Sequence, residues 1–175
     1  MRWVALLRAV NLGARNKVPM ANLRALLEEA GYGNVRTYIA SGNVVLDGPA
    51  GKKALGSALE RLVADAFDVE TTAILRKPRE LAVTLDEHPF GSDTSKTHVA
   101  FLAARPANAA ADRLEEAAGG GDRVILAGAD VYLRLPQGVH SSGLSPARVE
   151  SLLGVPATMR NWRTVAKLAE LAAEA

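Results

Sequence analysis

The pattern of hydrophobic and polar positions begins with a strand and a helix. Residues 2–9 form a nearly continuous apolar run, which is typical of a strand buried on both faces. A polar, glycine-containing loop over residues 10–18 follows. Leu23, Leu26 and Leu27 then recur at helical spacing, in a segment that Pro19 would start and Gly31 would end.

The next residues predict a hairpin, a second helix and a fourth strand. Residues 34–40 and 44–46 favour strands on either side of a turn at Ser41-Gly42-Asn43. Apolar residues at helical spacing from Leu55 to Phe67 predict a helix, and residues 69–76 read as a strand. The resulting order, β-α-β-β-α-β, is that of the ferredoxin-like unit.

The same order of elements returns in the second half, without a repeat at the level of residues. A short helix over residues 78–87 and a loop over 88–96 come first. The expected elements are then strands over 97–103, 123–127, 131–135 and 157–160, and helices over 107–118, 146–153 and 161–173. We therefore expect an α+β fold of two ferredoxin-like halves packed together. Their predicted boundaries are 1–77, a connector over 78–96, and 97–175 with an appended C-terminal helix.

Composition narrows the class of protein. The chain of 175 residues has no cysteine, which excludes disulfides, thiol nucleophiles and cysteine-based metal sites. No apolar run approaches the length of about 18 residues that a spanning helix needs, and the first run is too short for a signal peptide. We expect a cytoplasmic protein with no membrane partner. The sequence leaves its oligomeric state open.

Charge is uneven along the chain. Residues 1–46 carry six basic and two acidic side chains, whereas residues 47–154 carry 12 basic and 15 acidic ones. The concentration of positive charge near the N-terminus favours anionic partners. An ordinary solvated surface is the alternative interpretation.

The predicted topology suggests one candidate site. In a β-α-β-β-α-β sheet, the loop after the first strand and the turn of the central hairpin lie at the same end of the sheet. Together these segments supply cations, amides and a hydroxyl, with no carboxylate: Arg8, Asn11, Arg15, Asn16, Lys17, Ser41 and Asn43. Such a group suits an anion such as phosphate. The alternative is that the asparagines complete turns, where asparagine is common.

Other motifs offer less chemistry. Asn161 is placed to cap the last helix, next to Arg160 and Trp162, and the tryptophan can pack on the core or stack on a ligand. His98 and His140 are the candidate general bases, and His140 adjoins Ser141 and Ser142. No nucleophile elbow, phosphate-binding glycine loop or metal-ligand spacing is present, so we expect no cofactor and no metal.

Several stretches resemble a known bacterial family. They are residues 5–13, 35–45 and 160–165, supported by His88-Pro89-Phe90, residues 98–102 and residues 131–133. Together they resemble the family known as domain of unknown function 1697. The resemblance implies a small cytoplasmic α+β protein without an established reaction or cofactor. Members of that family usually carry glycine where this chain has Ala9 and Ala14. They often carry an Arg-Ser-Lys-Leu run where this chain has residues 141–144.

Three functional hypotheses follow. The first is that Arg8, Arg15 and Lys17 bind a phosphate-bearing ligand, a nucleotide or nucleic acid, which Asn11, Ser41 and Asn43 orient. Arg160, Asn161 and Trp162 are further candidate ligand-binding residues. The second hypothesis is an interaction module in which the polar motifs are structural. The third is an enzyme that uses His98 or His140 as a general base.

Overall fold

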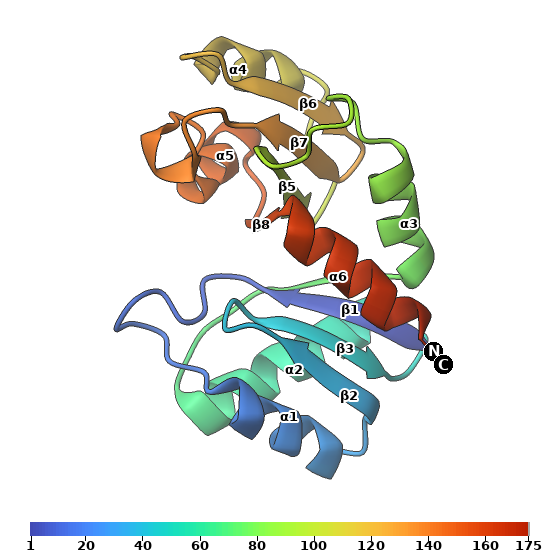
Figure 1. The fold of residues 1–175 in the computed structure, drawn as a ribbon. Helices are drawn as coiled ribbons and strands as arrows, with labels where there is room; N and C mark the ends of the chain where they lie inside the picture. Colours follow the sequence, from blue (N-terminus) through green and yellow to red (C-terminus); the bar gives the residue numbers. More distant parts are fainter. Residues whose placement is uncertain (175) are drawn as a thin grey trace. The chain divides into compact units, whose positions relative to one another are not determined.

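The structure is a computed structural model and describes residues 1–174. Two four-stranded antiparallel sheets and six α-helices make up this part of the chain (Figure 1). Contacts divide the chain into two compact units. The first comprises Met1–Ala82 with Lys167–Ala175, and the second comprises Val83–Ala166. The boundary falls inside helix α3 (Pro78–Asp86) and inside helix α6 (Trp162–Ala173), so each helix contributes to both units.

The first sheet has the strand order β2-β3-β1-β4, which is the ferredoxin-like order read from its other edge. Its strands are β1 (Arg2–Leu7), β2 (Gly33–Tyr38), β3 (Asn43–Asp47) and β4 (Ala73–Arg76). Helix α1 (Met20–Glu29) follows β1, and helix α2 (Lys52–Phe67) follows β3. All neighbouring strands run antiparallel, as the sequence predicted.

The second sheet repeats this topology, with the order β6-β7-β5-β8. Its strands are β5 (Thr97–Leu102), β6 (Arg123–Ala127), β7 (Asp130–Arg134) and β8 (Ala157–Asn161). Helix α4 (Ala110–Ala117) follows β5. The 3₁₀ turn η1 (Val139–Ser141) and helix α5 (Pro146–Leu153) follow β7. The predicted α+β fold with two ferredoxin-like strand orders is confirmed.

Both faces of the first sheet are buried, which explains why β1 is a continuous apolar run. Trp3, Ala5 and Leu7 belong to a core that also contains buried leucines of α1 and α2. Val4 and Leu6 alternate with them and are also inaccessible to solvent. The C-terminal part of α6 lies on this second face, where Glu174 forms an ion pair with Arg36 of β2 (Figure 1). Arg2 donates to Asp47 at 2.9 Å, and this bond lowers the pKa of the Asp47 carboxyl to about 2.

The second sheet is also buried on both faces. Ala100 and Leu102 of β5 pack into a core with α4 and α5. On the opposite face, the buried Tyr132 hydroxyl donates to the backbone oxygen of Thr84 at 2.7 Å. Burial raises the pKa of Tyr132 to about 12, so the hydroxyl stays protonated and keeps donating at neutral pH. This bond ties the second-unit end of α3 to the sheet.

Several boundaries differ from the sequence-based expectations, and two of them have a clear physical reason. The fourth strand starts at Ala73 and not at Val69. The residues before Ala73 form a connection that is hydrogen-bonded next to the end of β1, where the Arg8 N–H donates to the Thr72 oxygen at 3.0 Å. Pro19 precedes α1 and is not its first residue, since its ψ of 121° is extended. Among the described residues, no helix combines the length and apolar character needed to cross a bilayer.

The cap that the sequence predicted for α6 is present. The Asn161 side-chain oxygen accepts a hydrogen bond from the Thr164 N–H at 2.9 Å. We expect Asn161→Ala to lower the free energy of unfolding by about 1 kcal/mol. That loss corresponds to a melting temperature lower by roughly 2–4 °C. Asn161→Ser, which retains an acceptor, is the control and should stay close to wild type. If the alanine and serine variants melt together, the cap contributes nothing.

Candidate functional site

The loop after β1 and the β2–β3 turn meet at one end of the first sheet, as the topology predicted. The Leu7 N–H donates to the Gly42 oxygen at 2.8 Å, and the Asn11 side-chain amide donates to the Ala40 oxygen at 2.7 Å. In Figure 1 the β1–α1 loop extends beyond the strands on this side. We call residues 8–19 and 39–43 the sheet-end surface.

The asparagine side chains of this surface are engaged in internal hydrogen bonds. The Asn11 amide also donates to the Val18 oxygen, and its side-chain oxygen accepts from the Val18 N–H, both at 2.8 Å. Asn43 is fully buried and donates to the Tyr38 oxygen and to the Ser41 hydroxyl. Asn16 donates to the Ala9 oxygen. These contacts match the turn-completing interpretation of the asparagines.

The exposed part of the loop is a miniature hairpin. The Asn11 N–H donates to the Asn16 oxygen at 2.8 Å, and Leu12 and Arg15 exchange backbone hydrogen bonds. Gly13 sits at the first central position of the turn with a φ of 57°, as in a type II′ turn. The side chains of Leu12, Arg15 and Lys17 are exposed on this hairpin and its exit.

Left-handed backbone conformations concentrate on the sheet-end surface. Ala9, Asn11, Asn16 and Ile39 all have φ values between 47° and 58°. Asparagine tolerates this conformation, but it is strained for alanine and more so for a β-branched residue such as isoleucine. Strain of this kind persists only where the surroundings determine the conformation, and it gathers at functional sites. The loop and the turn are therefore held in a defined shape.

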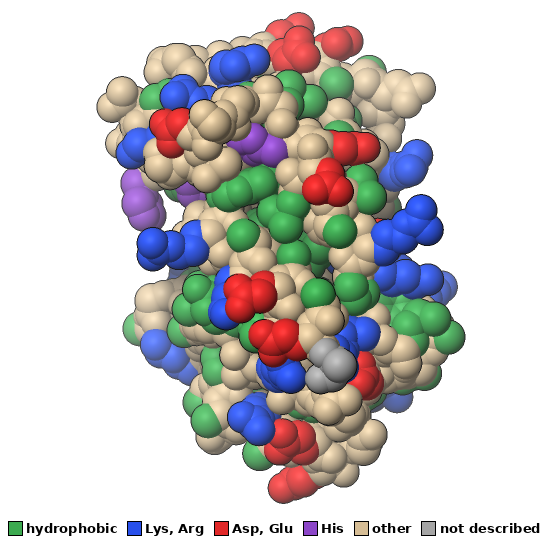
Figure 2. All heavy atoms as spheres, turned by 45° about the vertical axis from the view of Figure 1, so that its right-hand side comes forward, with side chains coloured by type: hydrophobic (Ala, Val, Ile, Leu, Met, Phe, Trp, Pro, Cys, Tyr) green, Lys and Arg blue, Asp and Glu red, His purple; other side chains and the backbone are tan. Residues whose placement is uncertain are grey.

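Charge on the sheet-end surface is of one sign. Neither segment contains an aspartate or glutamate, while Arg15 and Lys17 are exposed. On the face drawn in Figure 2, by contrast, acidic and basic side chains are intermixed. A phosphate approaching Arg15 or Lys17 therefore meets no carboxylate from either segment.

Arg8 lies in different surroundings from the other two cations. It lines an open hollow of about 560 Å³ beside α2 and the α2–β4 connection, and this hollow also contains Glu60 and Glu70. Neither Arg15 nor Lys17 lines it. The expectation of a single carboxylate-free group thus holds for the two segments but not for the environment of Arg8.

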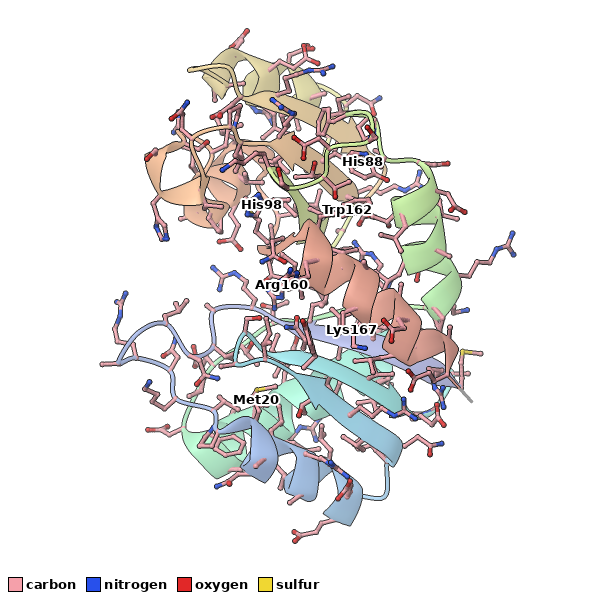
Figure 3. All side chains as sticks on the ribbon, in the orientation of Figure 1. Met20, His88, His98, Arg160, Trp162 and Lys167 are labelled. Carbon is pink, nitrogen blue, oxygen red and sulfur yellow. The ribbon has the colours of Figure 1, made fainter. Side chains whose placement is uncertain are left out.

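The remaining predicted residues, Arg160, Asn161 and Trp162, belong to the second unit. Arg160 is 7% exposed and donates to the Thr158 hydroxyl at 2.6 Å and to the Met159 oxygen. Its burial lowers its pKa to about 10. The Trp162 ring packs against His88, with 4.5 Å between ring centroids (Figure 3). The packing alternative proposed for Trp162 therefore describes its contacts, and Asn161 serves as the cap.

Among the described residues, neither candidate general base, His98 or His140, makes a hydrogen bond to a serine. The Ser142 hydroxyl donates to Asp122 at 2.6 Å and accepts from the Leu144 N–H, and neither of these bonds involves His140. Burial lowers the pKa of His98, whose Nδ1 has no hydrogen-bond partner among the described residues. Within residues 1–174, no three histidine or carboxylate side chains are grouped to hold a metal ion.

Comparison with known proteins agrees with the motifs. The family model described as protein of unknown function (DUF1697) matches residues 1–132. The chain belongs to the DUF1697 family. Among curated proteins, none matches the sequence. A similar solved structure is that of the conserved bacterial protein SP0830 from Streptococcus pneumoniae, with 23% identity, a TM-score of 0.71 and coverage of 98% of each chain. That likeness supports the fold.

The structure of this DUF1697 protein gives a physical reason for the glycine that the family resemblance leads us to expect at position 9. Ala9, where the resemblance leads us to expect glycine, has a φ of 58°. Glycine adopts this conformation without strain, whereas alanine does not. The loop of this DUF1697 protein keeps the left-handed conformation even without that glycine.

Sequence reasoning missed the polar residues around Arg8 in this DUF1697 protein. Ser57, Glu60, Arg61 and Ala64 lie on one stripe of α2, and they line the hollow together with residues 70–72. The available signal was the spacing of these four residues, which places them on one helical face. The end of β4 holds another missed residue, the buried Arg76.

Arg76 and Arg160 occupy equivalent positions in the two sheets. Arg76 pairs with Val4, the third residue of β1, and Arg160 pairs with Val99, the third residue of β5. Both arginines are buried. The two halves of this DUF1697 protein therefore share a residue-level feature that the sequence comparison of the halves did not reveal.

Proposed function

We propose that the sheet-end surface binds nucleic acid through its phosphate backbone. The observation that carries this proposal is that Arg15 and Lys17 are exposed on a loop that is hydrogen-bonded to the β2–β3 turn. Neither the loop nor the turn contains an acidic residue. Phosphate contacts from lysine and arginine supply most of the affinity in binding that is independent of nucleotide sequence.

The shape of the surface favours a polymer over a mononucleotide. Arg15 and Lys17 belong to the β1–α1 loop, which extends beyond the sheet (Figure 1). Neither residue lines the hollow next to Arg8. A projecting loop offers a mononucleotide little enclosure, but it can contact successive phosphates of a strand. The internal bonds of Asn11 and Asn16 fix the loop before binding, which reduces the entropy lost on association.

The chemistry of the loop also predicts weak dependence on nucleotide sequence. Residues 8–19 contain no aromatic side chain on which a base could stack. Binding would therefore depend mainly on charge, and its affinity would fall steeply as salt concentration rises.

A salt-dependent titration tests the proposal. Fluorescently labelled single-stranded DNA, RNA and duplex DNA are titrated with the protein at several salt concentrations, with ATP as a mononucleotide comparison. The Arg15→Ala/Lys17→Ala double variant is expected to bind every polymer more weakly. If both cations contact phosphates, its plot of log affinity against log salt concentration should be shallower by about 1.5 to 2.

The matched control removes the same charge elsewhere in the first unit. Arg24 of α1 and Lys53 of α2 are exposed, so Arg24→Ala/Lys53→Ala has the same net charge as the test variant. The control should keep most of the wild-type affinity. If both double variants lose the same affinity, the effect depends only on net charge and the proposal is contradicted. The proposal is also contradicted if the wild-type protein binds none of the polymers.

A further inference from the structure

The hollow beside Arg8 has walls that are fixed by hydrogen bonds. The Thr71 hydroxyl donates to the Arg8 oxygen at 2.7 Å, and the Arg8 N–H donates to the Thr72 oxygen at 3.0 Å. On the opposite wall, the Glu60 side chain accepts from the Ala73 N–H at 2.9 Å. The end of β1, the start of β4 and one face of α2 are thus connected around a single depression.

Seven of the eight residues that line this hollow have polar or charged side chains. Besides the groups already named, it contains the Arg61 guanidinium, the Glu70 carboxylate and the Ser57 hydroxyl. Ala64 supplies its one small apolar side chain. The volume of about 560 Å³ suits a small molecule, but the lining lacks the aromatic and aliphatic side chains that usually hold an apolar ligand.

Side chains in this lining retain hydrogen-bonding capacity. Among the described residues, the side chains of Arg61, Glu70 and Ser57 have no hydrogen-bond or ion-pair partner. Arg61 and Glu70 carry opposite charges and border the same space. A ligand there can therefore meet a cation and a carboxylate together.

The balance of charge selects the class of ligand. Two cations, Arg8 and Arg61, and two carboxylates, Glu60 and Glu70, give the lining no net charge. A polyphosphate would be repelled by the carboxylates, and a simple amine by the arginines. A molecule with an anionic group at one end and an ammonium group at the other satisfies both.

We infer that this hollow is a binding site for a small zwitterion. The arginines bind its carboxylate or phosphate, Glu70 binds its ammonium group, and the Ser57 and Thr72 hydroxyls add hydrogen bonds. The inference does not depend on nucleic-acid binding, because Arg15 and Lys17, the cations of that proposal, do not line the hollow.

Chemical-shift titrations of isotope-labelled protein test this inference with defined probes. O-phosphoethanolamine and β-alanine carry charges of both signs and differ in the anionic group, whereas inorganic phosphate carries only negative charge and ethanolamine only positive charge. At millimolar concentration we expect at least one zwitterion to shift the amide signals of residues 70–72. This zwitterion should bind more tightly than inorganic phosphate and more tightly than ethanolamine. The zwitterion with the higher affinity then shows whether the site prefers a phosphate or a carboxylate.

Two substitutions separate the ends of the ligand. Arg61→Ala should lower the affinity for the zwitterion and for inorganic phosphate by about two- to fivefold, which is the contribution of an exposed ion pair. Glu70→Ala should weaken binding of the zwitterion and of ethanolamine, and it should strengthen binding of inorganic phosphate, because a repelling carboxylate is removed. Arg24→Ala and Glu28→Ala, on the exposed side of α1, are the controls. The inference is overturned if no zwitterion shifts these signals, or if the test variants bind the zwitterion as the controls do.

Discussion

Replacing Gly42 with alanine is expected to destabilise the first unit by about 2–4 kcal/mol, through overpacking and a left-handed backbone. Gly42 has a φ of 81° in the turn between β2 and β3. A Cβ atom there would lie 2.5 Å from the Val10 side chain and 2.9 Å from the Leu7 Cβ. Val10 and Leu7 are both buried in the first core, so neither can easily move aside.

The matched control for this prediction is Gly13→Ala. Gly13 is also left-handed, with a φ of 57°, but a Cβ atom there would meet nothing within 4 Å. The stability lost in Gly13→Ala should therefore be limited to the cost of the left-handed backbone, about 1–2 kcal/mol.

Urea unfolding followed by the fluorescence of Trp3 measures the difference. Trp3 lies in the first core, and a Trp162→Phe background removes the second tryptophan from the signal. If Gly42→Ala and Gly13→Ala lose the same stability, the close approach of the loop to the turn is not an energetic constraint.

The sequence predicted the convergence of these segments because topology alone determines it. Once the order β-α-β-β-α-β is assigned, the loop after β1 and the β2–β3 turn must lie at one end of the sheet. Local signals also placed two helix ends correctly: Gly31 follows α1 with a positive φ, and Asn161 caps α6. Each of these signals acts within a few residues, so no tertiary information is needed to read it.

The sequence did not predict how the polar side chains of the site are used. Asn11 and Asn43 could equally have pointed to a ligand, and only their distances to backbone oxygens show that they close turns. The pattern of hydrophobic and polar residues also did not predict that Arg8 lines a hollow with two carboxylates. Its neighbours Glu60 and Glu70 come from segments that the prediction had not assigned to the site: Glu60 lies on α2, and Glu70 lies in the α2–β4 connection, which was read as part of a strand.

In the sheet-end surface, the asparagine amides make internal hydrogen bonds, whereas the cations Arg15 and Lys17 are exposed. The asparagines hold the loop and the turn in shape, while Arg15 and Lys17 remain exposed to a partner. This division makes a testable distinction: substitutions of the amides should act mainly on stability, and substitutions of the cations mainly on binding.

Asn11 offers the strongest test of that distinction. Its side chain makes three hydrogen bonds of 2.7–2.8 Å, two with Val18 and one with Ala40, and so joins the loop to the β2–β3 turn. Val18 itself is fully buried, so its N–H would lose its partner in an Asn11→Ala variant. We expect this variant to lose about 2–4 kcal/mol of stability, because each lost bond contributes about 1 kcal/mol and alanine is strained at this φ.

Asn16→Ala is the matched control, because Asn16 has the same φ of 52° as Asn11 but only one side-chain hydrogen bond, to Ala9. The two variants share the backbone cost, so the difference in their urea midpoints isolates the additional bonds of Asn11. Equal stability of the two alanine variants would mean that the bond between loop and turn is dispensable. In that case Arg15 and Lys17 would lose their rigid support.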